Sequence, residues 1–277
     1  MDTTEEELLT KIHKVTLYIL LAFDKVCREN DLTYFLDSGS ALGAVRHGGF
    51  IPWDDDIDVG MPRKDYERFL QIGQEKLPKE FFIQTRETDP NYRRFAAKLR
   101  LRGTVFPEQD TLPYKENGFF IDIFPFDNVP RNKYLAKCNL YIARCMFHII
   151  RSWHSEKQSP SFLRRFLVNT FVKKMTKSQI DRMGEHYLIF CRKYENKETG
   201  FCTCYSWGMS QYNTYIFDVN KLLPINDISF EGHYVKIMND PDYYLRLMYG
   251  DYMVLPPEDK RHIQHLEGVI DFGKYTI

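Results

Sequence analysis

The sequence predicts an α/β (α+β) protein in which a mixed sheet is flanked by helices and a helical insertion interrupts the chain. Three patterns support this prediction. A long amphipathic helix opens the chain, short apolar strands follow as far as residue 130, and residues 132–196 have helical spacing. We expect a catalytic core over residues 1–130, a helical lobe over 131–200, and strands and helices of 201–277 that complete the core.

The first elements predict a helix, a short strand, a tight turn and a second helix. From Leu8 onward, apolar residues recur at alternating spacings of four and three, so an amphipathic helix should end near Asn30. Residues 32–36 predict a strand. Gly39 and Ser40 should end that strand before a turn or helix of small residues.

Acidic residues occupy the next predicted strand. Asp56 and Asp58 alternate with Ile57 and Val59 at the strand period of two, so both carboxylates should point to one face. Pro62 suits the first turn of the helix that follows. Further strands are predicted at 81–84, 95–101, 119–124, 201–207 and 230–237, and a last helix should begin at Asp240-Pro241.

The composition excludes several classes of protein. Lys and Arg number 38, as do Asp and Glu, so no overall positive field would hold nucleic acid. The six cysteines contain no CxxC pair, which indicates thiols in a reducing compartment and no zinc site. No secretory signal is recognisable, and no apolar run reaches the roughly 20 residues of a membrane span. We therefore expect a cytoplasmic protein.

Four aspartates lie between residues 54 and 58, and their mutual repulsion requires a nearby cation or proton. Oxygen ligands favour Mg²⁺, with Mn²⁺ as the second choice, and such ions are shared with the phosphates of a substrate. An acidic surface turn or a calcium loop is the alternative. The apolar residues on both sides and the missing EF-hand spacing favour metal-dependent phosphoryl chemistry.

Gly39 and Ser40 predict a phosphate-binding turn. The glycine allows close approach of the backbone, and the serine hydroxyl with nearby amides can hold a phosphate at a helix N-terminus. Arg46 and His47 lie between this turn and the acidic strand as candidate phosphate ligands. For Arg46, a surface ion pair is an equal alternative. Lys98 is a further candidate for binding substrate oxygens.

Asp122 is the single charge in the apolar strand 119–124 and must therefore be paired. A salt bridge to Lys98 or Arg100 is one possibility. We favour a metal shared with Asp56 and Asp58, which makes these three aspartates the predicted metal ligands and catalytic residues. Asp122 is also the candidate acceptor for a proton of the attacking hydroxyl.

The motif over residues 36–59, with Gly39-Ser40, Arg46-His47, Ile51-Pro52-Trp53 and Asp54-Asp55-Asp56-Ile57-Asp58, resembles the signature of the LicD family, which includes fukutin-related enzymes. The likeness continues at residues 121–127 and 249–261. It implies a nucleotidyltransferase-like fold in which Asp56, Asp58 and Asp122 bind metal and Gly39-Ser40 binds phosphate. Ala41 departs from the pattern, because a bulkier residue is common there, and residues 132–196 match no motif of the family.

The resemblance also implies the reaction. The family transfers a phosphorylated alcohol, typically phosphocholine in bacterial members, from CDP-choline or another CDP-alcohol to a hydroxyl of a cell-surface glycan. Teichoic acid, lipooligosaccharide or another lipid-linked glycan is then the expected acceptor. Trp53 would be the first wall to test in an aromatic cage around a quaternary ammonium. The alternatives are a nucleotide-adding transferase and an inactive metal-binding scaffold.

Residues 161–177 carry five basic residues without an acid, interleaved with apolar ones. This pattern predicts peripheral contact with an anionic surface at the inner face of the membrane. The alternative is a helix whose apolar face packs inside the helical lobe.

Overall fold

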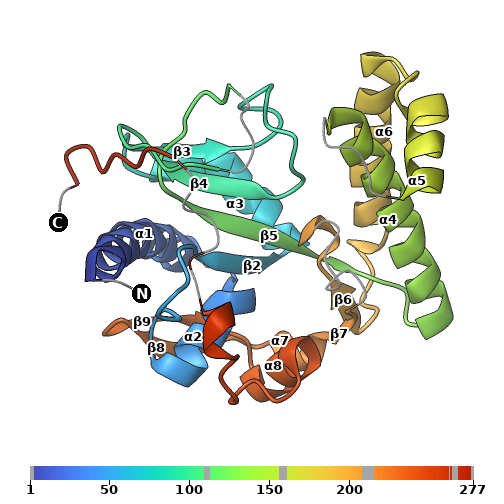
Figure 1. Ribbon diagram of the computed structural model, residues 1–277. Helices are drawn as coiled ribbons and strands as arrows, with labels where there is room; N and C mark the ends of the chain where they lie inside the picture. Colours follow the sequence, from blue (N-terminus) through green and yellow to red (C-terminus); the bar gives the residue numbers. More distant parts are fainter. Residues whose placement is uncertain are drawn as a thin grey trace. The chain divides into compact units, whose positions relative to one another are not determined.

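The computed structural model describes residues 3–108, 113–155, 161–207, 215–261, 263 and 268–275. The chain forms two compact units, one of Met1–Pro125 with Val219–Ile277 and one of Phe126–Asp218. Both units are drawn in Figure 1.

A sheet forms the centre of the first unit. Its strand order is β1 (Phe35–Leu36), β2 (Asp58–Pro62), β5 (Phe120–Asn128), β4 (Ala97–Leu101) and β3 (Phe81–Gln84). β1 runs antiparallel to β2, and β4 runs antiparallel to both β3 and β5. The sheet and its flanking helices confirm the predicted fold class.

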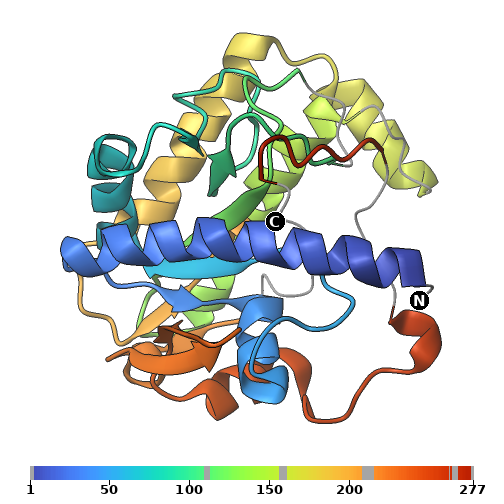
Figure 2. The same ribbon diagram turned by 90° about the vertical axis from the view of Figure 1, so that its left-hand side faces the viewer.

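Helices cover the sheet of the first unit. The amphipathic helix α1 (Thr3–Glu29) packs against β4 and against α3 (Arg63–Lys76). It is the long blue helix in the foreground of Figure 2. Its apolar stripe, with Ile12, Ile19 and Phe23, is fully buried. The remaining elements are α2 (Ser38–His47), α7 (Val219–Leu222), β8 (Asn226–Phe230), β9 (His233–Ile237), α8 (Pro241–Tyr249) and the 3₁₀ helix η5 (Glu258–Lys260).

The second unit is mainly helical. Its elements are α4 (Lys133–His154), α5 (Phe162–Leu167), the π-helix η1 (Val168–Val172), α6 (Lys177–Cys191), the 3₁₀ helices η2 (Arg192–Tyr194) and η3 (Tyr205–Trp207), and the strands β6 (Phe201–Thr203) and β7 (Phe217–Asp218). The helix α4 packs against α6. The predicted break at Ser159-Pro160 lies outside the described residues. None of the helices that the structure describes has the length and apolarity needed to traverse a bilayer.

Three element boundaries differ from the sequence prediction in ways that matter for the site. The second helix begins at Ser38, so Gly39 and Ser40 lie in its first turn, because the side chain of Asp37 accepts the Ser38 N–H and caps the helix. The strand β2 begins only at Asp58, so Asp56 lies in the segment that leads into it. The strand β5 continues to Asn128 because its last residues pair with β6.

Candidate active site

The backbone of Asp58 is fixed against the first turn of α2. The Asp37 N–H donates to the Asp58 carbonyl at 2.9 Å, and the Asp58 N–H donates to the Ser40 hydroxyl at 2.9 Å. Asp37 is fully buried and also accepts a short hydrogen bond from the hydroxyl of Tyr244. The predicted phosphate turn and the acidic strand therefore meet through direct hydrogen bonds.

The acidic run itself folds into a compact cluster. Asp54, Asp55 and Asp56 each offer a carboxylate oxygen within 4.8 Å of the other two, an arrangement that can hold a cation. Gly39 makes room for it, because a Cβ there would lie 2.8 Å from Asp54 Oδ2. The ring Nε2 of His13 lies 2.7 Å from the Asp54 carbonyl oxygen and fixes the backbone of the cluster from α1.

Asp58 and Asp122 lie in adjacent strands beside this cluster. The Asp122 N–H donates to the carbonyl of Ile57 at 2.9 Å, which sets the register of β5 against the acidic segment. Burial raises the pKa of Asp58 well above its ordinary value, and the charges of Asp56 and Asp122 raise it further. A divalent cation would relieve this repulsion, and an all-oxygen ligand set suits Mg²⁺ or Mn²⁺.

A cavity of about 220 Å³ lies beside two of the predicted metal ligands, Asp56 and Asp122, which line it together with Lys98. The third predicted ligand, Asp58, is not among its lining residues. The remaining lining residues are Arg94, Phe106, Pro107, Glu108 and Phe120. The lining therefore contains both carboxylates and cations, which suits a substrate that presents phosphate oxygens to metal and to cations at once.

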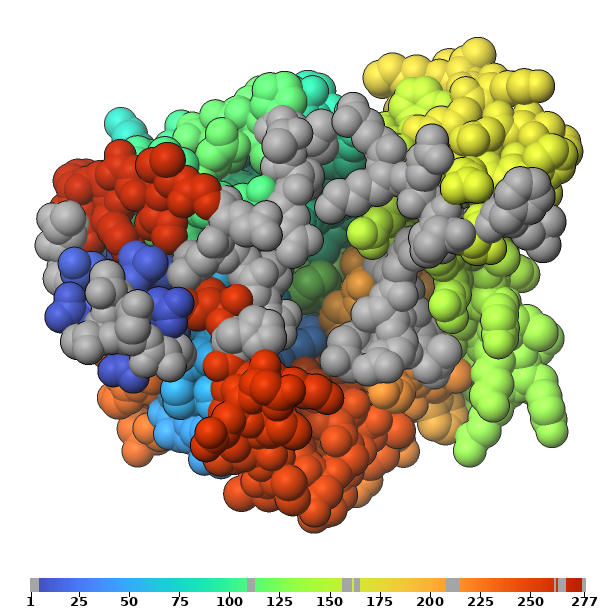
Figure 3. Space-filling model, viewed as in Figure 1, coloured from blue at the N-terminus to red at the C-terminus, as the bar shows by residue number. Residues whose placement is uncertain are grey.

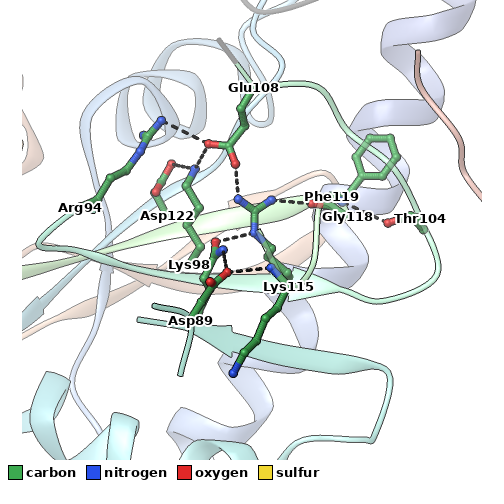
Figure 4. A network of polar contacts seen from close by, with 11 residues as sticks. Asp89, Arg94, Lys98, Thr104, Glu108, Lys115, Gly118, Phe119 and Asp122 are labelled. Carbon is green, nitrogen blue, oxygen red and sulfur yellow. Dashed lines mark hydrogen bonds and ion pairs between the residues drawn. The ribbon is translucent and has the colours of Figure 1, made fainter. Parts of the chain in front are cut away.

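Lys98 is the central cation of the cavity. Its ammonium nitrogen lies 3.1 Å from Asp122 Oδ2 and 3.3 Å from Glu108 Oε2 (Figure 4). Burial lowers the pKa of Lys98, and the two carboxylates oppose that effect. The salt bridge between Asp122 and Lys98, one of the two pairings considered from the sequence, is thus present.

Glu108 was not identified from the sequence. Its carboxylate binds Lys98, Arg94 at 3.2 Å and Arg100 in a short contact. Burial would raise the pKa of Glu108, but these three cations outweigh burial and lower it to about 2. No motif signals this role, because Glu108 follows a strand-free segment and meets its partners only through the fold.

Arg100 is held by a chain of buried groups behind the cavity. Its Nε donates to the Gln84 side chain at 2.6 Å, and Gln84 in turn donates to Asp89 at 2.8 Å. A further guanidinium nitrogen donates to the Gly118 carbonyl at 2.9 Å. Figure 4 shows this network continuing from Asp89 to Lys98. Arg100 therefore supports Glu108 and does not itself line the cavity.

Arg46, His47 and Trp53 lie elsewhere. Arg46 donates to the Tyr252 carbonyl at 2.8 Å, and the rings of His47 and Trp53 are 6.3 Å apart at their centroids. The guanidinium of Arg261 lies 5.7 Å from the centroid of the Trp53 ring. Arg46 and His47 stand at the opposite end of α2 from Ser40, about 10 Å along the helix axis. The structure does not bring these three residues to the lining of the described cavity.

Comparison with known proteins matches the region that contains the site to a protein family. Residues 31–166 match the family model of the LicD/FKTN/FKRP nucleotidyltransferase domain. The chain is 28% identical over 265 residues to the lipopolysaccharide cholinephosphotransferase LicD of Haemophilus influenzae, covering 91% of this chain and 94% of that protein. It is 29% identical over 135 residues to mouse ribitol 5-phosphate transferase FKRP, covering 48% of this chain and 22% of that protein.

The matched region contains the residues that build the site. Asp56, Asp58, Lys98 and Asp122 all lie within residues 31–166, as does the turn at Ser40. The expected resemblance is confirmed by the family model and by the full-length similarity. The chain therefore belongs to the LicD family.

Proposed function

We propose that this chain is a metal-dependent transferase that moves a phosphoalcohol, phosphocholine first, from a CDP-activated donor to a hydroxyl of a cell-surface glycan such as teichoic acid or lipooligosaccharide. The similarity to a lipopolysaccharide cholinephosphotransferase over 91% of the chain supports a phosphotransferase. The observation that carries the proposal is the cavity in which Asp56 and Asp122 face Lys98.

The metal would be Mg²⁺, or Mn²⁺ in its place, held by Asp56, Asp58 and Asp122. The crowding of carboxylates around Asp58 supports this assignment, because their charges oppose its ionisation when no cation is close. Asp54 adds a fourth oxygen donor close to Asp56. Once bound, the ion would neutralise charge on the donor pyrophosphate.

The chain's own groups would hold the donor. Ser40 accepts the Asp58 N–H, so its hydroxyl proton points elsewhere and can donate to a phosphate oxygen at the N-terminus of α2. Lys98 would bind an oxygen of the transferred phosphate from the opposite side. Asp122, which is paired with Lys98 at 3.1 Å, would accept the proton of the attacking hydroxyl.

The reaction would be a single displacement at phosphorus. The acceptor hydroxyl oxygen attacks the phosphorus that carries the alcohol, and the bond from that phosphorus to the bridging oxygen breaks. CMP leaves with the bridging oxygen and its electron pair, while the hydroxyl proton passes to Asp122. Alignment and charge stabilisation supply most of the rate enhancement in such transfers.

The alcohol is the least constrained part of the proposal. A ribitol phosphate donor is the second candidate, because part of the chain is similar to a ribitol 5-phosphate transferase. The aromatic residue chosen for a choline cage, Trp53, already faces Arg261. A donor panel of CDP-choline, CDP-ribitol and CDP-glycerol therefore belongs in the test.

The deciding experiment measures CMP release with Mg²⁺, each CDP-alcohol and a lipooligosaccharide or teichoic acid acceptor, together with mass labelling of the acceptor. Asp58→Asn should abolish both signals, and Asp181→Asn, on α6 of the second unit, should retain them. EDTA should stop the reaction and Mg²⁺ should restore it. Acceptor-independent nucleotide addition would favour a nucleotide-adding transferase, and a wild-type protein without turnover would favour an inactive metal-binding scaffold.

A further inference from the structure

The second unit carries a charge imbalance that the whole chain lacks. Between Asn128 and Ile180 the sequence has eleven Lys and Arg residues and a single acid, Glu156, although basic and acidic residues are equal in number over the full chain. This stretch contains α4, α5 and η1. A strongly basic segment of this kind attracts polyanions or anionic membranes where its side chains are exposed.

The helix α4 is apolar on two faces. Ala136, Leu140 and Ala143 are buried on the face that packs inside the unit. The other face exposes Tyr134 (83%), Leu135 (55%), Tyr141 (66%) and Ile142 (48%). Tyr134 and Leu135 lie about two turns from Tyr141 and Ile142, so the four side chains share one side of the helix. Figure 3 shows α4, in light green, at the surface of the molecule.

Cations flank this stripe. Lys133 and Lys137 are exposed beside Tyr134 and Tyr141 on the first turns of α4. A helix with aromatic and aliphatic residues outward and lysines at the edge matches the pattern of helices that lie in the interface of an anionic bilayer. Tyrosine suits that position because its ring is apolar and its hydroxyl remains hydrated.

The neighbouring segment repeats the pattern. In α5 and η1, Phe166, Leu167 and Phe171 are exposed at 54%, 46% and 64%. The Lys173 ammonium donates to the carbonyls of Trp153 and Ser155 at 2.8 Å each, which ties this segment to the end of α4. For residues 161–177, the alternative was a helix that packs its apolar face inside the lobe. At least three of their large apolar side chains nevertheless lie outside the core.

We propose that the outward face of α4, defined by Tyr134, Leu135, Tyr141 and Ile142 with Lys133 and Lys137, docks onto an anionic lipid bilayer. Charge decides for a bilayer over a second copy of the chain, because two such units would bring their excess positive charges together. The exposed apolar side chains enter the headgroup region while the lysines pair with anionic lipids. The proposal is independent of the phosphotransferase chemistry.

Vesicle co-sedimentation of the full chain tests the proposal without any donor or acceptor. We expect binding to vesicles of 30% phosphatidylglycerol in phosphatidylcholine, no binding to pure phosphatidylcholine, and loss of binding in about 1 M salt, where charges are screened within about 3 Å. Lys133→Glu with Lys137→Glu should weaken binding at least about tenfold. Tyr141→Ser with Ile142→Ser should weaken it to a similar extent.

The matched control is Lys64→Glu with Lys79→Glu, which changes the net charge equally at exposed positions of the first unit. It should bind vesicles like the wild type, and thermal unfolding should show that all variants fold. If the control weakens vesicle binding as much as the α4 lysine variant does, the loss of binding follows from net charge alone and the proposal is overturned. So would undiminished binding of the α4 variants, or a wild-type dimer that Tyr141→Ser with Ile142→Ser converts to a monomer.

Discussion

The ammonium of Lys98 lies 3.1 Å from the carboxylate of Asp122 and 3.1 Å from the centroid of the Phe120 ring. A buried lysine in this position is held by one carboxylate on each side and by an aromatic face. The donor phosphate would therefore meet a cation whose place is already fixed, so little reorganisation would be needed when it binds.

Lys98→Met should lower kcat with CDP-choline by about 100-fold or more, because it removes a fixed cation from the transferred phosphate. Lys98→Arg should restore part of the loss, since the charge returns in a different shape. The matched control is Lys115→Met, which changes a lysine of the same network that does not line the cavity. Wild-type kinetics in Lys98→Met would contradict the proposed contact between Lys98 and the transferred phosphate.

Asp58→Asn should stabilise the metal-free protein while abolishing activity. Burial, with Asp56 and Asp122, raises the pKa of Asp58 above its ordinary 3.8, so stability is lost as the pH rises from that value through the raised pKa. At neutral pH without metal, the free energy of unfolding of the variant should exceed that of the wild type by at least about 1 kcal/mol. Urea unfolding measures this, and millimolar Mg²⁺ should stabilise the wild type more than the variant. An unstabilised variant contradicts the assignment.

Glu108→Gln should destabilise the protein by about 3 kcal/mol at neutral pH, because it leaves Lys98 and Arg100 without their shared carboxylate. Burial raises the pKa of Glu108 but the cations lower it to about 2, so its contribution is present above the ordinary 4.5 and lost as the pH falls through 2. The free energies of unfolding of wild type and variant, measured against pH, should therefore converge between pH 4.5 and 2. A difference that stays constant over this range would show that the ion pairs of Glu108 contribute nothing to it.

His13→Ala should raise the Mg²⁺ concentration for half-maximal activity about tenfold, because the ring no longer holds the backbone of Asp54. His13→Gln, which keeps a donor, should stay close to the wild type. Burial lowers the pKa of His13, and the hydrogen bond to Asp54 opposes that effect. The wild type should therefore lose more stability than His13→Gln as the pH falls below 6.5. Equal metal dependence in all three proteins would exclude this positioning role.

Local patterns predicted the elements whose determinants are near in sequence. The strand at 81–84 appears as β3 with the same bounds, and Asp240 caps α8 before Pro241 as expected. The start of α2 was misplaced because the capping role of Asp37 depends on β1 ending at Leu36. A two-residue strand has too little periodicity to locate its end.

Some residues of the candidate site could likewise be predicted from local sequence, and others could not. Asp58 and Asp122 were identifiable because each is a charge on an apolar strand, and the fold places those strands side by side. Glu108 was not, since its three cationic partners come together only through the tertiary fold. Arg46 follows the opposite pattern: it is close to the motif in sequence, but a helix carries it away from Ser40.

The hydrogen bond from Tyr244 to Asp37 joins residues 207 positions apart. During synthesis on the ribosome, α2 would therefore lack this support for its capping aspartate until α8 had emerged. Nascent or prematurely terminated chains that already contain every aspartate of the site would still lack the contact that supports the predicted phosphate turn. Assembly of the site would then wait until α8 has been synthesised, which limits catalysis by shorter nascent chains.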